Sequence, residues 1–208
     1  MSHKIFDQKK LWKGKWEAAA LRAANGFAKR CFLYSKKNSR HKTLLDLGCG
    51  LGQDSVYFAK KGFRVTALDF SDACLSKIPK NIKNLKPVCM SLDNLNFKNN
   101  SFDIIYAHLS LHYFDGKTTA KIFGRLYAIL KKNGLIFIKC KSTGDELCGK
   151  GKKIGANLYY RKKHLRHFFD KDYMESTLSR FKIIRIRKSS SVYKHYKSNY
   201  IEAIAKKI

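Results

Sequence analysis

An acidic residue followed by three closely spaced glycines is the first feature of this sequence that could do chemistry. The stretch Thr43 to Asp54 reads TLLDLGCGLGQD, with an acid at Asp46 and glycines at Gly48, Gly50 and Gly52. Glycines allow positive φ angles and leave no Cβ between the main chain and a ligand. A strand that leads through a glycine-rich turn into a helix is how α/β proteins approach a nucleotide. We therefore expect a nucleotide-like ligand at this turn.

The position of Asp46 bears on the charge of that ligand. The dinucleotide fingerprint G-x-G-x-x-G is not matched, because Gly52 comes one residue early and Gln53 stands where the third glycine belongs. A carboxylate two residues before the first glycine would repel a pyrophosphate and attract a cation. The stretch therefore favours a cationic or amino-bearing ligand over a dinucleotide.

A second carboxylate ends the next predicted strand. Residues 63–69, FRVTALD, alternate as a strand does and end in Asp69, 17 residues after Gly52. In Rossmann-type folds an acid at this place receives the ribose hydroxyls, because a carboxylate accepts two hydrogen bonds in parallel. A helix N-cap is the alternative role, but Ser71 already supplies one. We expect Asp69 to bind ribose, with Phe70 and Ser71 beside the adenine.

A histidine-containing segment supplies the candidates for proton transfer. HLSLHYF, residues 108–114, follows the predicted strand FDIIYA at the edge where open α/β sheets bind ligands. His112 titrates near neutral pH and stands beside Tyr113, so these two are the candidate catalytic residues, with local packing as the alternative role. His164 and His167 lie in a basic segment and are expected at the surface. No spacing typical of metal ligands is present.

Strands and helices alternate along the chain in the order that a Rossmann-like sheet needs. We expect strands at residues 43–47, 63–69, 86–91, 102–107, 135–140, 181–188 and 199–206, the last two as an antiparallel pair. We expect helices at residues 5–37, 54–61, 71–82, 117–131 and 170–179. This is an α/β fold with a seven-stranded sheet and helices on both faces. It divides into an N-terminal helical cap, residues 1–42, and one domain, residues 43–208.

Two segments beside the expected ligand have alternative interpretations. The N-terminal helix is either packed on the sheet edge or a lid that covers the ligand with Trp12 or Trp16. The glycine-rich residues 142–158 follow a strand at the ligand-binding edge and are either a mobile substrate loop or an uninformative insert. Asp103, at the opposite end of its strand, is expected to be a structural charge.

The net charge of +29 is concentrated in the two flanks of the sequence. Residues 1–42 carry +10, residues 43–115 carry +1 and residues 116–208 carry +18. Lysine outnumbers arginine, as an AT-rich genome would produce, but glutamate is also AT-coded and occurs only four times. Attraction of RNA or another polyanion is therefore an alternative to a purely compositional origin.

Cysteine usage and hydropathy indicate the cellular compartment that we expect for the protein. The six cysteines are scattered without a C-x-x-C pair, which favours free thiols in a reducing cytoplasm. No run of eighteen apolar residues occurs and the N-terminus has no apolar core of a signal peptide. We expect a cytoplasmic protein without integral membrane association. The oligomeric state is left open.

The order of these motifs resembles the class I S-adenosylmethionine (SAM) methyltransferases from about residue 40 to the end of the chain. The resemblance rests on DLGCGLG, on the strand that ends in Asp69, on FDIIYAHLSLHYF, and on Asn133-Gly134 before the fifth strand. LSLHYF and HFFDKDYMESTLSRFKI are most similar to the small bacterial tellurite-resistance and methyltransferase-11/12 type. The resemblance implies SAM as cofactor, whose sulfonium and amino groups agree with the acid at Asp46.

The resemblance also implies which residues bind SAM. Asp46 and the backbone of Gly48, Cys49 and Gly50 would hold the methionyl part, within a loop that continues through Gly52 to Asp54. His108 and Leu109 would flank the sulfonium. The family often has an acid at the start of the loop after the third strand, four residues before the leucine that corresponds to Leu95, and this acid binds the adenine amino group. This chain has Ser91 there, so Asp93 or the backbone of Leu92 would take over that contact.

The methyl acceptor is not identified by any motif. The Asn/Asp-Pro-Pro-Tyr/Phe motif of adenine-N6 and glutamine methylation is absent after residue 107, and no Pro-Cys of the cytosine-C5 enzymes occurs there. A small-molecule acceptor is the first hypothesis. An RNA methyltransferase that uses the basic flanks is the second. A SAM-binding or basic scaffold protein without turnover is the third.

Overall fold

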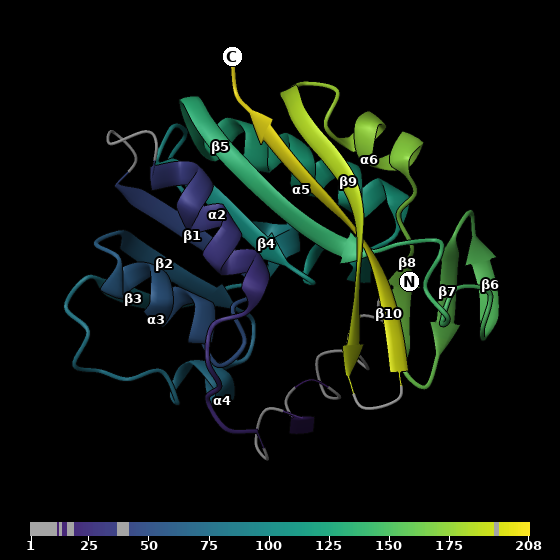
Figure 1. Cartoon of the computed structure of the whole chain (residues 1–208), viewed down its shortest axis with the longest axis horizontal. Helices are drawn as coiled ribbons and strands as arrows, with labels where there is room; N and C mark the ends of the chain where they lie inside the picture. Colours follow the sequence, from purple (N-terminus) through teal and green to yellow (C-terminus); the bar gives the residue numbers. More distant parts are fainter. Residues whose placement is uncertain (1–11, 13, 16–18, 37–41, 194–195) are drawn as a thin grey trace.

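The computed structural model describes residues 12, 14–15, 19–36, 42–193 and 196–208. Its centre is a seven-stranded sheet in the order β3-β2-β1-β4-β5-β10-β9 (Figure 1). The strands are β1 (Thr43–Leu47), β2 (Arg64–Asp69), β3 (Leu85–Cys89), β4 (Phe102–His108), β5 (Leu130–Lys141), β9 (Lys182–Tyr193) and β10 (Tyr196–Lys206). The first five are parallel, whereas β10 is antiparallel to both β5 and β9. The predicted α/β sheet with an antiparallel end is confirmed.

Helices cover both faces of this sheet, as predicted. One face carries α2 (Gly26–Lys36) and α3 (Gln53–Lys60), and the other carries α5 (Gly116–Ile129) and α6 (Lys171–Thr177) (Figure 1). Successive side chains of a strand point to opposite faces. On β4, Tyr106 therefore packs with Phe27 and Phe58 of the first face, while Ile105 packs with Leu126 of the other. The two buried layers fix the register of β4 and the direction of its last residue.

The order of the strands brings the predicted site residues to one edge. β1 pairs with β2 on one side and with β4 on the other, so the chain order reverses at β1. Ligands of open α/β sheets bind outside the carboxyl ends of the strands at such a switch point. Asp46, Asp69 and His108 end or nearly end these three strands. They therefore belong to the same edge.

The opposite edge is held by Asp103 at the start of β4, as predicted. Its carboxylate accepts hydrogen bonds from the Thr43 backbone at 2.9 Å and hydroxyl at 2.7 Å, and forms an ion pair with Lys131 at 3.0 Å. Burial alone would raise the pKa of Asp103, but these partners lower it to about 2. Asp103 thus joins β4 to β1 and β5 far from the ligand edge.

The N-terminal helix predicted over residues 5–37 is partly wrong. Residues 19–25 have no helical structure, and α2 begins at Gly26 because Asn25 caps it: the Asn25 side-chain oxygen accepts from the Ala28 backbone at 2.9 Å. We call residues 19–25 the strap. The strap passes the short helix α4, Asp72–Leu75, and leads into the first turn of α2 (Figure 1). Residues 5–11, 13, 16–18 and 37 lie outside the described residues.

Two other predicted elements differ from the structure. The helix expected at residues 71–82 is limited to α4, which ends four residues before Pro79. The irregular loop expected at residues 142–158 contains β6 (Lys152–Gly155) and the start of β7 (Leu158–Arg161), which pair antiparallel with each other. With β8 (His164–His167) they form a separate three-stranded sheet.

The expectation that His164 and His167 lie at the surface is also wrong. Both are buried, because β8 packs against the segment that follows β4. The His164 ring lies 6.2 Å from the ring of Tyr113, and the His167 ring lies 4.3 Å from that of Tyr173. In the part of the chain that the structure describes, no helix is long and apolar enough to cross a membrane.

Candidate active site

The glycine loop after β1 has the backbone that the sequence predicts. Gly48, Gly50 and Gly52 have φ angles of 68°, 56° and 77°, which favour glycine. A Cβ at Gly48 would lie 2.5 Å from the Cβ of Ser110, so the loop also packs closely against the end of β4. The backbone N–H groups of Gly48 and Cys49 donate to the carbonyl of Leu68 at 2.7 and 2.9 Å. The loop is thus fixed to β2 and β4.

Asp69 is held at the end of β2 in a position suited to a diol. The Gly50 backbone donates to Asp69 Oδ2 and the Ser71 backbone to Asp69 Oδ1, both at 3.0 Å. The Cys74 thiol and the Phe70 backbone N–H also donate to this carboxylate. The Ser71 hydroxyl beside it is buried and has no hydrogen-bond partner in the described structure. The Ser71 hydroxyl therefore has hydrogen-bonding capacity that the protein does not use.

Asp46 is the most deeply buried acid of the site. Its carboxylate accepts a hydrogen bond from the Ser55 hydroxyl of α3 at 2.5 Å. Burial raises the pKa of Asp46 well above its usual range, and the nearby carboxylates of Asp54 and Asp69 raise it further. Without a ligand, the negative form of Asp46 is therefore disfavoured.

Asp54, at the start of α3, binds the strap. It accepts from the Asn25 backbone at 3.0 Å, from the Asn25 side-chain amide, and from the Tyr106 hydroxyl at 2.9 Å. Burial raises the pKa of Asp54 despite these donors. Sequence reasoning did not single out Asn25. The available signal was an asparagine directly before a glycine at a possible helix start, a preferred N-cap residue.

Three buried carboxylates thus surround the glycine loop. Asp46, Asp54 and Asp69 all have raised pKa values, in each case because burial disfavours the charged form. Among the described residues, no cationic side chain lies within ion-pair distance of any of them. A positively charged ligand would supply the missing countercharge. These three carboxylates suit the sulfonium and amino groups of SAM and do not suit a pyrophosphate.

The residues predicted to bind adenine lie after β2 and β3. The hydroxyl of Ser91 donates to Asp93 within the short helical turn η1, Leu92–Asn94, so the two alternatives for the adenine contact are linked to each other. Leu92 is buried, whereas Phe70 after β2 is partly exposed. Their contact with adenine remains a prediction.

His108 closes the site from the end of β4 and carries no charge. Burial and the nearby Lys139 lower the pKa of His108 to about 3. Its ring stacks near Phe27 and Tyr106, and its Nδ1 lies 3.2 Å from the side-chain nitrogen of Asn25. The next residue, Leu109, has a φ of 58° and donates its N–H to the Lys139 carbonyl at 2.8 Å. The chain therefore turns sharply where the sulfonium was predicted.

His112, the candidate base, is buried in the turn η2, Leu111–Tyr113. Its Nδ1 has no hydrogen-bond partner in the described structure, and its ring lies 4.3 Å from that of Tyr113. Burial, with Arg166 and Lys141 nearby, lowers the pKa of His112 well below its usual range. Burial likewise raises the pKa of Tyr113 to about 12. Both side chains are neutral near pH 7, and a catalytic role for them remains a prediction.

One tryptophan of the predicted lid lies against this turn. The Trp12 ring makes edge contacts with Tyr113 at 5.4 Å and with His164 at 5.5 Å. Nζ of the nearby Lys15 lies 3.2 Å from His164 Nε2 and 4.6 Å from the centre of the Trp12 ring. Trp12 and Lys15 therefore lie against η2 and β8, as part of a lid would. Trp16 lies outside the described residues.

Comparison with known proteins finds methyltransferases as relatives. Residues 44–134 match the family model described as a methyltransferase domain. Phosphoethanolamine N-methyltransferase 1 of Triticum aestivum is 36% identical over 104 residues, which cover 47% of this chain and 21% of that protein. The chain thus matches about a fifth of that relative's length.

Solved structures are similar over most of the chain. A SAM-dependent methyltransferase from Methanosarcina mazei has a TM-score of 0.72 at 18% identity, covering 90% of this chain and 99% of that one. The 1,6-didemethyltoxoflavin-N1-methyltransferase of Burkholderia thailandensis, solved with 1,6-didemethyltoxoflavin and S-adenosylhomocysteine, has a TM-score of 0.67 at 20% identity, covering 88% and 78%. Residues 44–134 are thus similar to a methyltransferase domain, and the chain has the fold seen in solved SAM-dependent methyltransferases.

Proposed function

We propose that this protein transfers a methyl group from SAM to a small-molecule acceptor. The observation that carries the proposal is the ring of three buried, uncompensated carboxylates around the glycine loop, with Asp69 held for a ribose diol. This arrangement matches a ligand that is both a nucleoside and a cation. The toxoflavin enzyme and the phosphoethanolamine enzyme, whose names give small-molecule acceptors, support the acceptor class.

The residues of this chain would bind the parts of SAM in order along the edge of the sheet. Asp69 would accept from the ribose hydroxyls, and the segments after β2 and β3, with Phe70, Ser71 and Leu92, would enclose the adenine. Asp46 and the loop from Gly48 to Gly52 would hold the methionyl end. His108 and Leu109 would border the position of the methyl group. SAM supplies an activated methyl group, so the protein's main task is to orient the acceptor and exclude water.

Proton removal would have to use a neutral group if the acceptor requires it. His112 Nδ1 has no hydrogen-bond partner among the described residues, so in the tautomer that is protonated at Nε2 its lone pair would be available for a proton. Its lowered pKa makes it a weak base that stays unprotonated over the physiological range. We propose His112 and Tyr113 as the residues nearest to the leaving proton. An acceptor that reacts through a lone pair would not need them.

The proposal is tested by turnover of SAM in a panel of small metabolites, with S-adenosylhomocysteine as the measured product. We expect product with at least one acceptor and none without an acceptor. An Asp46→Asn variant removes one carboxylate with little change of shape and should lower turnover at least tenfold. Binding of SAM without product from any acceptor would favour the scaffold protein without turnover.

The charge of +29 favours RNA methylation as a second candidate. Total RNA therefore belongs in the same panel, at two salt concentrations. Binding that uses the basic flanks should weaken steeply with salt through counterion release. A cytoplasmic location is also proposed, supported by six free cysteine thiols, and fluorescence of a tagged protein in cells tests it.

A further inference from the structure

A cleft next to His108 is lined mainly by cationic and hydroxyl side chains. It has a volume of about 440 Å³ and lies between the start of α2 and the strands β9 and β10. Its lining includes four cationic residues, Arg30, Lys139, Arg187 and Lys188, and one acid, Glu202. The cleft therefore has a surplus of three positive charges. Three consecutive serines of β9, residues 189–191, add hydroxyl groups.

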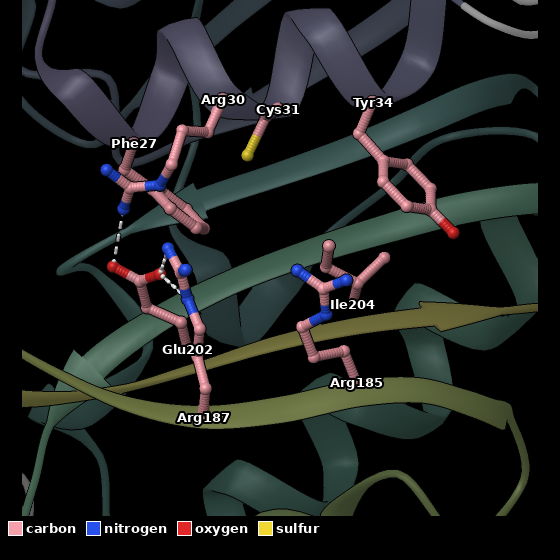
Figure 2. A pocket seen from close by; sticks show the side chains of 8 residues that line it. All are labelled: Phe27, Arg30, Cys31, Tyr34, Arg185, Arg187, Glu202 and Ile204. Atoms are coloured by element: carbon pink, nitrogen blue, oxygen red, sulfur yellow. Dashed lines mark hydrogen bonds and ion pairs between the residues drawn. The ribbon is translucent and has the colours of Figure 1, made fainter.

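Glu202 orients these cations. Figure 2 shows Arg30 from α2 and Arg187 from β9 converging on the Glu202 carboxylate, with distances of 2.8 and 2.7 Å. Lys139 Nζ lies 3.3 Å from the same carboxylate, and the Ser189 hydroxyl donates to it at 2.9 Å. One buried carboxylate thus positions three cations that it can neutralise only in part. Lys139 also lies 4.2 Å from the centre of the Tyr200 ring.

The hydrogen bonds of Asn25 determine which nitrogen of His108 carries its proton. Asn25 Oδ1 accepts from the Ala28 backbone, so Asn25 Nδ2 must be the atom that faces His108. An amide nitrogen can only donate, so Nδ1 of the neutral His108 ring is the acceptor and Nε2 carries the hydrogen. No hydrogen bond joins His108 Nε2 to another described residue. His108 lines the cleft, and its Nε2–H is an uncharged donor without a partner among the described residues.

We infer that this cleft binds an anionic group of the methyl acceptor, a carboxylate or a phosphate, through Arg30, Lys139 and the Nε2–H of His108. The inference rests on the proposed function, since it assigns the acceptor's class at the same site. The cleft shares His108 and Leu109 with the predicted position of the methyl group. An acceptor anchored there would present its other end to that position. Charge-assisted bonds to cations and N–H donors are the strong contacts for such groups.

The test is a titration of the full chain, saturated with S-adenosylhomocysteine, with inorganic phosphate at constant ionic strength. NMR of ¹⁵N-labelled histidine reports both the tautomer of His108 and its response to the anion. We expect the Nε2–H form and a saturable shift of the His108 signals. A protonated Nδ1, or a shift that does not saturate, would overturn the inference.

Matched variants locate the binding. Arg30→Gln removes an accessible charge and should weaken phosphate binding about fivefold. The Lys139 side chain is largely buried, so Lys139→Gln should weaken phosphate binding about tenfold. Lys29 is the exposed neighbour of Arg30 in the sequence and does not line the cleft. Lys29→Gln should therefore change the affinity for phosphate by no more than about twofold. Thermal unfolding of each variant checks that the fold is kept. Equal weakening by Lys29→Gln and Arg30→Gln would contradict a localised site.

Parallel titrations with SAM and with RNA separate this inference from its competitors. If Arg30→Gln weakens SAM as much as phosphate, the cleft holds the carboxylate of the cofactor, and the acceptor site is refuted. If only an RNA oligonucleotide binds and phosphate does not, the small anionic acceptor is likewise refuted. A protein that binds phosphate in the cleft but never binds SAM would refute the proposed function instead.

Discussion

Asn25 joins the strap, α2, α3 and β4. Replacing it should therefore lower the free energy of unfolding more than replacing a surface asparagine. In Asn25→Ala, α2 loses its N-cap bond to Ala28, worth about 1 kcal/mol. The buried carboxylate of Asp54 also loses the side-chain amide donor, and a hydrogen bond to a charged group contributes about 2 kcal/mol. The backbone bond from Asn25 to Asp54 survives the change. The free energy of unfolding should therefore fall by roughly 3 kcal/mol.

A second substitution separates the two contributions. Asn25→Ser keeps a side-chain oxygen for the helix cap but loses the amide, so it should cost about 2 kcal/mol. Urea unfolding followed by circular dichroism measures both variants. For a chain of this size, the alanine variant should also melt roughly 6–12 °C lower.

The control is Asn81→Ala, an exposed asparagine in a turn, which should change the unfolding free energy by less than about 0.5 kcal/mol. The reasoning is refuted if Asn25→Ala is as mild as this control. Equal losses in Asn25→Ser and Asn25→Ala would show that the cap contributes nothing.

Three further predictions concern the loop, the acids and the candidate base. Gly48→Ala should destabilise the protein by about 2 kcal/mol, because φ is 68° at Gly48 and the new Cβ would clash with Ser110. Gly124→Ala, inside α5, should instead stabilise it by roughly 0.5–1 kcal/mol, because a Cβ there meets no other atom. Thermal unfolding compares the two variants. The raised pKa values of Asp46, Asp54 and Asp69 mean that these three acids bind more protons in the folded ligand-free protein than in the unfolded chain, so their contribution to stability should fall as pH rises from about 4. The lowered pKa values of His108 and His112 have the opposite sign, and the contribution of these two residues should rise up to about pH 6.5. A cationic ligand favours the ionised acids, so SAM affinity should rise over the same range, with proton release detectable by calorimetry in two buffers; affinity that falls with pH would contradict this. Because the pKa of His112 is lowered, the pH profile of kcat should show no step near 6.5, and a step there that His112→Asn abolishes would contradict its buried, neutral state.

The sheet and the glycine loop could be predicted because their signals are local. Alternating apolar residues define β2, the apolar run of β4 is buried on both faces, and the glycines of residues 48–52 take the positive φ angles that the ligand loop requires. Asp69 follows from its place at the end of β2 alone. These elements depend on neighbours in the sequence.

The errors arise where a distant partner decides the structure. The apolar residues of the strap have helical spacing, but Asn25 binds Asp54 and Tyr106, and Ala19 packs against the cluster around Leu51. His164 and His167 stand among basic residues, yet β8 carries them into the interior beside Tyr113 and Tyr173.

The cleft that we propose for the acceptor was beyond sequence reasoning for the same reason. Arg30, Lys139, Arg187 and Glu202 come from four different elements, and no spacing relates them. Their meeting depends on β10 being inserted between β5 and β9, which places Glu202 opposite α2. The tautomer that we infer for His108 likewise depends on Asn25, 83 positions earlier.

Calorimetric titration with SAM tests the central claim most directly. The wild-type chain should bind one SAM with micromolar affinity, and Asp69→Ala should weaken binding about a hundredfold, through loss of two hydrogen bonds to a carboxylate. Asp72→Ala, an exposed acid three residues further on, should bind like the wild type. A wild-type chain that ignores SAM and binds NAD would contradict the cationic nucleoside site, as would an Asp69→Ala variant that binds SAM unchanged.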